Sequence, residues 1–241
     1  MMPSSPIRWW SVQRRAAPYV FVAPFVVLFA VFMAYPLVYS VWMAFHVTNG
    51  PRSSIFVGLD NFRFLLRDPD FWTALRNTAV FAFFSVFLQL PLSLALALLL
   101  NARWVKGRNV FRLAFFSPHL VGQVFVAVLF SLIFIPRYGI LNRAIHAVAG
   151  WGLDTKWLMN PSLVMPALVI TSLWMYVGFN MIYFLAALQG VDRNLYEAAQ
   201  VDGANRWRQF LHVTVPGIKP VAVFVVLMST IGSLPFGYLL R

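Results

Sequence analysis

The sequence predicts an all-α protein that crosses a membrane several times. Of its 241 residues, 61% are hydrophobic and only 11% are charged, which is far from the composition of an average soluble domain. The apolar residues are gathered in five long runs, and each run is long enough to cross about 30 Å of hydrocarbon as a helix. No aspartate or glutamate lies inside any of the five runs. These observations together predict one polytopic domain built from membrane-spanning helices.

The five runs are expected to be the spanning helices. They cover residues 19–45, 78–100, 111–134, 165–188 and 221–240. The first run contains Pro24 and Pro36, so we expect a kink in it. It is too long for the core of a signal peptide and lacks a small-residue cleavage site, so it should stay in the mature chain. Residues 1–18 precede it, and residues 46–77 and 135–164 form the outer connections.

The net charge of +12 is explained by membrane topology rather than by nucleic-acid binding. Basic residues gather before the first run and in the second and fourth connections; they are Arg8, Arg14, Arg15, Arg103, Lys106, Arg108, Arg112, Arg193, Arg206, Arg208 and Lys219. Eleven basic residues therefore lie on one side of the membrane and seven on the other. The positive-inside rule places the richer side, and with it the N-terminus, in the cytoplasm. No nucleic-acid partner is expected.

The sequence gives no sign of catalytic or metal-binding residues. The four histidines lack the spacing of metal ligands, and the chain has no cysteine. No Gly-x-x-x-x-Gly-Lys-Ser/Thr loop is present, so any ATP hydrolysis must be carried out by a partner chain. The absence of acids from the apolar runs also weighs against a proton-driven carrier. We expect neither an enzyme nor a cofactor in this chain.

Residues 190–220 form a charged, amphipathic segment between the last two apolar runs. Asp192 is suited to cap a helix, and the alanines and the glutamate that follow favour helix. Gly203 is expected to end this helix in the left-handed conformation. Asn205 can cap a second helix, which Pro216 should end because the residue before a proline avoids helical geometry. A basic hairpin lying on the membrane would explain the cations here, but not Glu-Ala-Ala and Asp-Gly-Ala together.

This segment resembles the cytoplasmic EAA loop of ABC-importer permeases. The family pattern is E-A-A-x-x-D-G-A, followed by an aromatic residue and then by hydrophobic-x-hydrophobic-Pro. The matching residues are Glu197, Ala198, Ala199, Asp202, Gly203, Ala204, Phe210, Val213, Val215, Pro216 and Pro220. The resemblance implies that the first six of these residues belong to a coupling helix, which seats in a cleft of a cytoplasmic ATPase subunit.

A second stretch narrows the family. Residues 56–62 (FVGLDNF) and 70–78 (DFWTALRNT) are similar to the segment between the first two spans of sugar-type permeases. These permeases are related to the maltose and glycerol-phosphate importers. Taken alone, this stretch could instead be an ordinary amphipathic segment that lies along the outer interface of the membrane. The two stretches together identify the chain as a member of this permease family.

The resemblance also implies the architecture and the partners. Residues 19–241 would form an incomplete transmembrane domain of the type I ABC importers, with five helices of the six-helix core and the EAA-like loop at residues 190–220. The chain would provide half of the path for a sugar or related polyol across the cell membrane of a bacterium or archaeon. The implied partners are a second permease, two ABC ATPase subunits that bind ATP and magnesium, an extracytoplasmic solute-binding protein and membrane lipid.

The end of the sequence departs from the family pattern. After residue 233 the resemblance implies an outer loop and a sixth span, whereas residues 234–241 are foreign to it. We therefore expect only five of the six spans and a chain that is truncated at its C-terminus. A non-functional fragment of such a permease is the alternative function.

Polar side chains inside the apolar runs are candidates for the substrate path. Tyr176, Asn180 and Tyr183 fall at i, i+4 and i+7, on one face of the fourth span. Aromatic and amide side chains on one helix suit a sugar ring and its hydroxyls. The alternative is that each of them only bonds a neighbouring helix, which is the commoner role of such residues in membranes.

Overall fold

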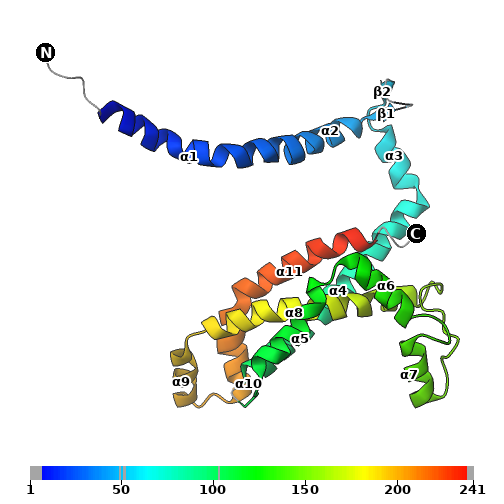
Figure 1. The fold of residues 1–241 in the computed structure, drawn as a ribbon, viewed down its shortest axis with the longest axis vertical. Helices are drawn as coiled ribbons and strands as arrows, with labels where there is room; N and C mark the ends of the chain where they lie inside the picture. Colours follow the sequence, from blue (N-terminus) through cyan, green and yellow to red (C-terminus); the bar gives the residue numbers. More distant parts are fainter. Residues whose placement is uncertain (1–6, 49, 51–52, 103, 238–241) are drawn as a thin grey trace. The chain divides into compact units, whose positions relative to one another are not determined.

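The computed structural model of the protein describes residues 7–48, 50, 53–102 and 104–237. Most of these residues are helical, and β1 and β2 are the only strands among them, so the all-α prediction is confirmed. They fall into two compact units, Met1–Trp72 and Thr73–Arg241 (Figure 1).

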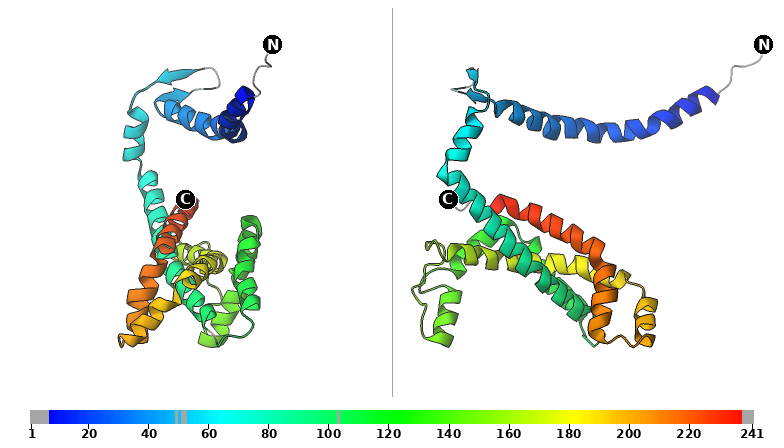
Figure 2. Two further views of the ribbon diagram at one scale, coloured as in Figure 1. Left: turned by 90° about the vertical axis from the view of Figure 1, so that its left-hand side faces the viewer. Right: turned by 180° about the vertical axis from the view of Figure 1, so that it is seen from behind.

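The unit Met1–Trp72 consists of one long helix, a hairpin and a short helix (Figures 1 and 2). Its elements are α1 (Ile7–Phe29), η1 (Ala30–Ala34), α2 (Tyr35–Met43), β1 (His46–Thr48), β2 (Ser54–Phe56) and α3 (Asp60–Arg67). The two strands pair antiparallel, with Val47 opposite Ile55. Asn61 attaches α3 to the hairpin, because its amide donates to the carbonyls of Ala44 (2.9 Å) and His46 (3.1 Å). Residues 56–62 therefore have a structural role in this unit.

The unit Thr73–Arg241 consists of helices that run back and forth beside one another (Figures 1 and 2). Its elements are α4 (Pro69–Asn101), which begins in the first unit, α5 (Arg108–Leu120), α6 (Gln123–Ile133), α7 (Ile140–Ala149), α8 (Val164–Gly190), α9 (Arg193–Val201), α10 (Arg206–Gln209), η2 (Phe210–Thr214) and α11 (Val215–Gly237). The central helix is α8, which packs against both α5 and α11.

Four helices in the described part of the chain are long and apolar enough to cross a membrane. They are Ala17–Met43, Pro69–Asn101, Val164–Gly190 and Arg206–Ser233. The pair α5 and α6 provides a fifth span if it makes a single crossing. This agrees with the five apolar runs of the sequence. The second span is longer than expected, because residues 70–78 form the first turns of α4 instead of part of an outer connection.

The third predicted span is not one straight helix. Its two parts, α5 and α6, meet at an angle of 98°. The break lies at Val121 and Gly122, whose backbones are extended, with ψ of 129° and 143°. Pro118 lacks an N–H and glycine has a low helix propensity, so this stretch does not sustain a helix. Non-helical backbone at membrane depth must be buried in protein or line a hydrated cavity.

Two π-helical segments carry their helices past a proline. Each segment, η1 and η2, ends two residues before the proline, which is Pro36 or Pro216. In an α-helix the proline ring would clash with the carbonyl four residues earlier. The N–H of Val215 instead bonds to the carbonyl of Phe210, five residues earlier, in the wider turn of a π-helix. The expectation that Pro216 ends the second loop helix is therefore wrong, and this helix continues from Arg206 to Gly237.

Two apolar clusters hold the unit Thr73–Arg241 together. The first joins α4, α8 and α11 and contains Ala97, Leu100, Met181, Phe184, Leu185, Leu188, Ile218 and Val225. The second joins α6 to α8 and contains Val126, Phe130, Phe134, Ala167 and Met175. Many other apolar side chains along these helices are exposed, as expected for a surface that faces lipid.

Two glycines, one in α8 and one in α11, allow close approach of neighbouring segments. A Cβ atom on Gly178 would overlap the carbonyl group of Phe115, so the backbones of α5 and α8 touch there. A Cβ atom on Gly217 would lie 2.8 Å from a methyl group of Val191. Small residues at such positions are the usual means of packing helices in membranes.

Candidate functional site

Residues 190–220 begin as the two capped helices that the sequence predicts. The side chain of Asp192 accepts a hydrogen bond from the N–H of Asn194 at 2.9 Å. The side chain of Asn205 accepts one from the N–H of Arg208 at 2.8 Å. Both predicted caps are confirmed, and each satisfies a backbone donor that has no partner inside its own helix.

The Asp-Gly-Ala step ends α9 in a Schellman turn. Gly203 has a φ of +74°, and its N–H donates to the carbonyl of Gln200 at 3.0 Å. The N–H of Ala204 donates to the carbonyl of Ala199 at 2.8 Å. These are the two hydrogen bonds of that turn, and the half-buried Ala199 and Ala204 are the positions that meet in it. The predicted left-handed glycine is confirmed.

Polar contacts hold the two halves of the loop together. The hydroxyls of Tyr196, from α9, and Thr214, from η2, lie 2.9 Å apart. The side chain of Gln209 donates to the carbonyl of Ala204 at 2.8 Å. The loop is therefore a fixed structure rather than a loose connection between two spans.

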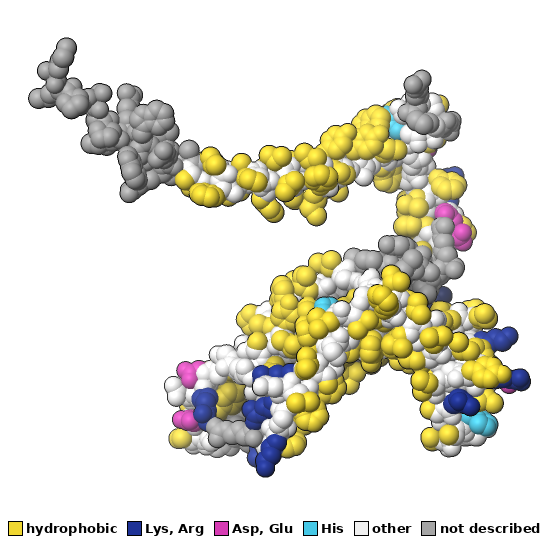
Figure 3. Space-filling view, in the orientation of Figure 1, with side chains coloured by type: hydrophobic (Ala, Val, Ile, Leu, Met, Phe, Trp, Pro, Cys, Tyr) yellow, Lys and Arg dark blue, Asp and Glu magenta, His cyan; other side chains and the backbone are white. Residues whose placement is uncertain are grey.

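The opposite side of the loop is exposed. Glu197, Ala198 and Asp202 are exposed, and so are two large apolar side chains, Val201 at 87% and Trp207 at 65%. Figure 3 shows that charged side chains of the unit Thr73–Arg241 gather around α9 and α10 at one end and around α7 at the other. Exposed apolar groups among charges on a rigid surface suit contact with another protein.

A polar pocket of about 130 Å³ lies between α4, α8 and α11. Its polar lining repeats every four residues on each helix, which is the spacing of one helix face. The polar lining residues are Ser85 and Gln89 on α4, Ser172, Tyr176 and Asn180 on α8, and Ser229 and Ser233 on α11. None of the residues that line this pocket is acidic or basic. This recurrence of polar residues in three apolar runs is the sequence signal by which the whole pocket could have been found.

Two of the three residues predicted for the substrate path line this pocket. The amide of Asn180 donates to the hydroxyl of Ser229 at 3.2 Å. The hydroxyl of Tyr176 accepts from the amide of Gln123 at 3.3 Å. Both hydrogen bonds join α8 to another helix, so these two side chains combine helix pairing with lining of the pocket.

The third predicted residue, Tyr183, is not among the residues that line the pocket. Its ring packs edge-on against Phe179, with the ring centroids 5.1 Å apart. His119, from α5, stacks on the same Phe179 at 4.0 Å and lies 5.5 Å from the ring of Tyr176. His119 stands out in the sequence as a polar residue inside an apolar run, but its contacts with Tyr176 and Phe179 of α8 are visible only in the structure.

Three buried polar atoms in the described part of the chain have no hydrogen-bond partner. They are Ser85 Oγ, Arg112 Nε and His119 Nδ1. Ser85 lines the polar pocket, and His119 lies against Tyr176, which also lines it. Leaving such a group unpaired costs roughly 1–3 kcal/mol. Unpaired polar atoms in or beside a pocket are suited to hydrogen-bond a water molecule held there.

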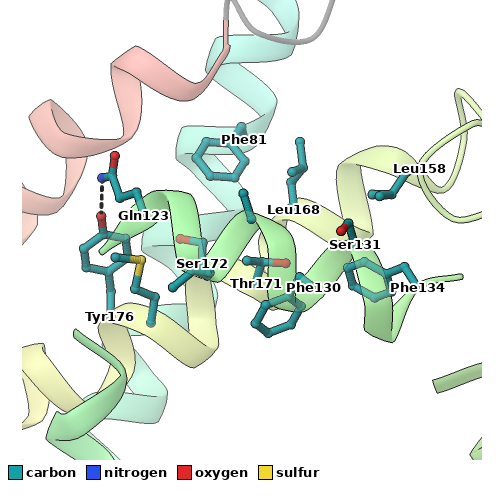
Figure 4. A pocket seen from close by; sticks show the side chains of 13 residues that line it. Phe81, Gln123, Phe130, Ser131, Phe134, Leu158, Leu168, Thr171, Ser172 and Tyr176 are labelled. Atoms are coloured by element: carbon teal, nitrogen blue, oxygen red, sulfur yellow. Dashed lines mark hydrogen bonds between the residues drawn. The ribbon is translucent and has the colours of Figure 1, made fainter. Parts of the chain in front are cut away.

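A larger and mostly apolar cavity of about 300 Å³ adjoins the polar pocket (Figure 4). Ser172 and Tyr176 line both of them, and the hydrogen bond between Gln123 and Tyr176 lies at their boundary. Gln123 is the first residue of α6, directly after the 98° break. The non-helical backbone of the third span is thus placed next to a cavity, as its hydrogen-bonding needs require.

The connection between α6 and α8 is organised by one buried amide. Asn142 is fully buried, and its amide donates to the carbonyls of Thr155 (2.8 Å) and Leu153 (3.3 Å). Its carbonyl oxygen accepts a hydrogen bond from the indole of Trp157. A buried amide with all these partners fixes the connection in one conformation.

An exposed ion pair spans the same connection. The guanidinium of Arg137 donates to the carboxylate of Asp154. This hydrogen bond, together with the attraction between the two charges, raises the pKa of Arg137 above its ordinary value. Because the pair is exposed, it orients the loop more than it stabilises the fold.

The chain matches a family of transport proteins over more than half of its length. Residues 90–240 match the family model described as "Binding-protein-dependent transport system inner membrane component". The chain belongs to this family. The family match continues past residue 233, so the expectation that residues 234–241 are foreign to the family is wrong for residues 234–240. The alternative of a non-functional fragment is not favoured.

Curated relatives of the family are similar over nearly the whole chain. The "Arabinooligosaccharides transport system permease protein AraP" of Bacillus subtilis is 41% identical over 220 residues, which are 91% of this chain and 69% of that protein. The "Lactose transport system permease protein LacF" of Rhizobium radiobacter is 36% identical over 90% of this chain and 72% of that protein. The predicted membership of the ABC-importer permeases is confirmed.

Solved structures of the family share the fold. A chain of the crystal structure of "a bacterial ABC transporter involved in the import of the acidic polysaccharide alginate" has a TM-score of 0.80. It is 28% identical and covers 96% of this chain and 78% of its own. A second structure holds that kind of transporter in complex with an "alginate pentasaccharide-bound periplasmic protein", with a TM-score of 0.76 and 27% identity.

Proposed function

We propose that this chain is a permease subunit of an ATP-driven sugar importer and provides half of the path for a neutral sugar or polyol. The proposed partners are a second permease, two ATPase subunits that bind ATP and magnesium, and an extracytoplasmic solute-binding protein. Relatives named for arabinooligosaccharides, lactose and trehalose/maltose support the substrate class. A similar structure in complex with a periplasmic protein supports the last partner.

The observation that carries this proposal is the continuity between the loop and the pocket. Arg206–Ser233 is one uninterrupted helical stretch of 28 residues. Its first turns form the second half of the EAA-like loop, and its far end contributes Ser229 and Ser233 to the polar pocket. A movement of the loop must therefore move part of the pocket wall.

The loop would couple ATP hydrolysis to transport. Its exposed side, which includes Glu197, Ala198 and Asp202, is suited to seat in a cleft of an ATPase subunit. Because α9 and the following helix are joined by the hydroxyls of Tyr196 and Thr214, both would move together when the ATPase subunits close. Such a displacement would shift the spans between inward-facing and outward-facing states.

The polar pocket favours a neutral, hydroxylated substrate. Its lining offers hydroxyls and amides as hydrogen-bond partners and no acidic or basic group. A charged substrate would lose its hydration there without gaining an opposite charge. Tyr176 and Phe179 add ring surfaces against which a sugar ring can pack. We therefore expect neutral saccharides to pass and uronates to be rejected.

The proposal is tested by uptake in proteoliposomes that contain the chain together with its partner subunits. Uptake of a radiolabelled neutral oligosaccharide should require both ATP and the solute-binding protein, and a uronate oligosaccharide should not compete. Asn180→Leu should lower uptake at least tenfold, because a buried hydrogen-bonding group worth roughly 1–3 kcal/mol is lost. Transport without ATP, or equal competition by the uronate, would contradict the proposal.

A matched variant separates a role in the path from a role in packing. Thr230→Ala changes a neighbouring residue of the last span that is exposed and bonds only to its own helix, at the carbonyl of Val226. This variant should transport as the wild type does. The amounts of both variants in the membrane should equal that of the wild type, and a matching loss in Thr230→Ala would remove Asn180 from the path.

A further inference from the structure

A groove at the α4–α5 connection has no part in the proposed transport path. It has a volume of about 390 Å³ and lies between the end of α4 and the start of α5. It is lined by Leu96, Leu99, Leu100, Trp104, Val105, Lys106, Phe111 and Phe115. The exposed Lys106 is the one charged residue in this lining, and the others are apolar.

The connection from α4 to α5 lies at the same end of the unit Thr73–Arg241 as the EAA-like loop (Figures 1 and 2). Leu100 and Ile218 belong to one apolar cluster, and Val105 and Val191 pack against it, so the groove and the two ends of the loop share this cluster. The apolar run of α4 ends at this level, so the groove lies at a boundary between hydrocarbon and water. Trp104 is 73% exposed there, and tryptophan is enriched at such boundaries.

Hydrogen bonds from Arg108 reach back to the connection that forms one wall of the groove. The guanidinium of Arg108 donates to the carbonyls of Val105 (3.2 Å) and Ala102 (2.7 Å). Gly107 takes a left-handed φ of +73° directly before Arg108. Lys106 is held between Val105 and Gly107 at the edge of the apolar walls.

All charged residues of the segment that connects α4 to α5, and of the first turn of α5, are basic. Residues 101–112 contain Arg103, Lys106, Arg108 and Arg112 and no acid. The nearest acids along the chain are Asp70 and Asp154. An occupant that complements this surface has an apolar tail and an anionic head.

We propose that the groove binds one anionic phospholipid. Its acyl chain would lie against Leu99, Phe111 and Phe115, all of which are exposed along their helices. Its phosphate would lie at Lys106. Basic pockets between membrane helices on the cytoplasmic side are suited to anionic headgroups, and each basic residue near such a headgroup favours it by about fivefold. A zwitterionic lipid would fill the apolar part without this preference.

The proposal is tested by quenching of tryptophan fluorescence with brominated lipids. The full chain is reconstituted with its partner subunits in vesicles that contain increasing fractions of brominated phosphatidylglycerol or brominated phosphatidylcholine. The contribution of Trp104 is the difference between each protein and its Trp104→Phe counterpart. Trp104 should be quenched at a several-fold lower fraction of brominated phosphatidylglycerol than of brominated phosphatidylcholine.

Variants of Lys106 and a matched control test whether Lys106 causes the preference for phosphatidylglycerol. Lys106→Gln should reduce the preference about fivefold, and Lys106→Arg should retain it. Lys156→Gln removes an exposed lysine from the α6–α8 connection and should change nothing. Equal quenching by both lipids, or an unchanged preference in Lys106→Gln, would overturn the proposal. Absence of quenching by either lipid would also overturn it, because another protein chain would then cover the groove. Loss of the preference in excess inorganic phosphate would overturn it as well, because the site would then bind a free anion.

Discussion

Replacing Gly203 by valine should uncouple the loop without preventing membrane insertion. Gly203 has a φ of +74°, and a Cβ atom added to it would meet no other atom within 4 Å. A side chain at this position therefore meets no steric clash with other residues and costs free energy only through the backbone conformation. This cost is about 1–2 kcal/mol for an L-residue in the left-handed region and greater for a β-branched one. A change of that size lowers the ratio of loops with the Schellman turn formed to loops with it broken by roughly 5–30-fold.

The assay is the ATPase activity of the assembled transporter with and without the substrate-loaded solute-binding protein. The stimulation of ATPase activity by the loaded binding protein should be highest in Gly203→Asn, lower in Gly203→Ala and lowest in Gly203→Val. Asparagine tolerates the left-handed conformation best and valine least. The amount of chain in the membrane should stay at the wild-type level in all three variants.

A second glycine of the same region provides the control. Gly190, at the end of α8, is exposed, has no positive φ and also has no atom within 4 Å of an added Cβ. Gly190→Ala should therefore leave the stimulation unchanged, whereas Gly203→Ala lowers it. Wild-type stimulation in Gly203→Val, or equal losses in Gly203→Asn and Gly203→Val, would refute the conformational argument.

Three further outcomes are expected. Gly178→Ala forces α5 and α8 apart, because the added Cβ would overlap the carbonyl of Phe115. Overpacking of about 1–3 kcal/mol should lower the melting temperature of the purified chain by roughly 3–10 °C. Gly232→Ala should not lower it, because no atom lies within 4 Å of its added Cβ. Asn142→Ala leaves buried carbonyls and an indole unpaired, so limited proteolysis should cut the α6–α8 connection at least tenfold faster. Alkaline phosphatase should be active when fused after Gly150 and inactive when fused after Gly203, and the reverse result would invert the proposed topology.

The loop was predictable from the sequence because its determinants are local. Asp192, Gly203 and Asn205 act on backbone groups within three residues of themselves, so residue type and spacing are sufficient to locate the caps and the turn. The apolar runs likewise carry their own signal, because length and composition decide whether a helix can span the membrane.

The remaining features depend on contacts between helices. The bend after Leu120 occurs where backbone groups reach a cavity formed by other helices, and an apolar run does not reveal it. Gly178 is one glycine among many in the sequence, and only the position of Phe115 makes its lack of a side chain necessary. Tyr183 shares a helix face with Tyr176, yet it packs against Phe179 and is not among the residues that line the pocket.

The helical stretch that includes η2 bends where the π-helical segment passes into α11 (Figures 1 and 2). Its hydrogen bonds nevertheless continue through the bend, because the N–H of Val215 bonds to the carbonyl of Phe210. Gly217 lies just after the bend, where its lack of a side chain lets it approach Val191. A helix that stays hydrogen-bonded through a bend passes a rotation of one arm on to the other. A turn of the loop arm would therefore be converted into a change in the direction of the arm that carries Ser229 and Ser233.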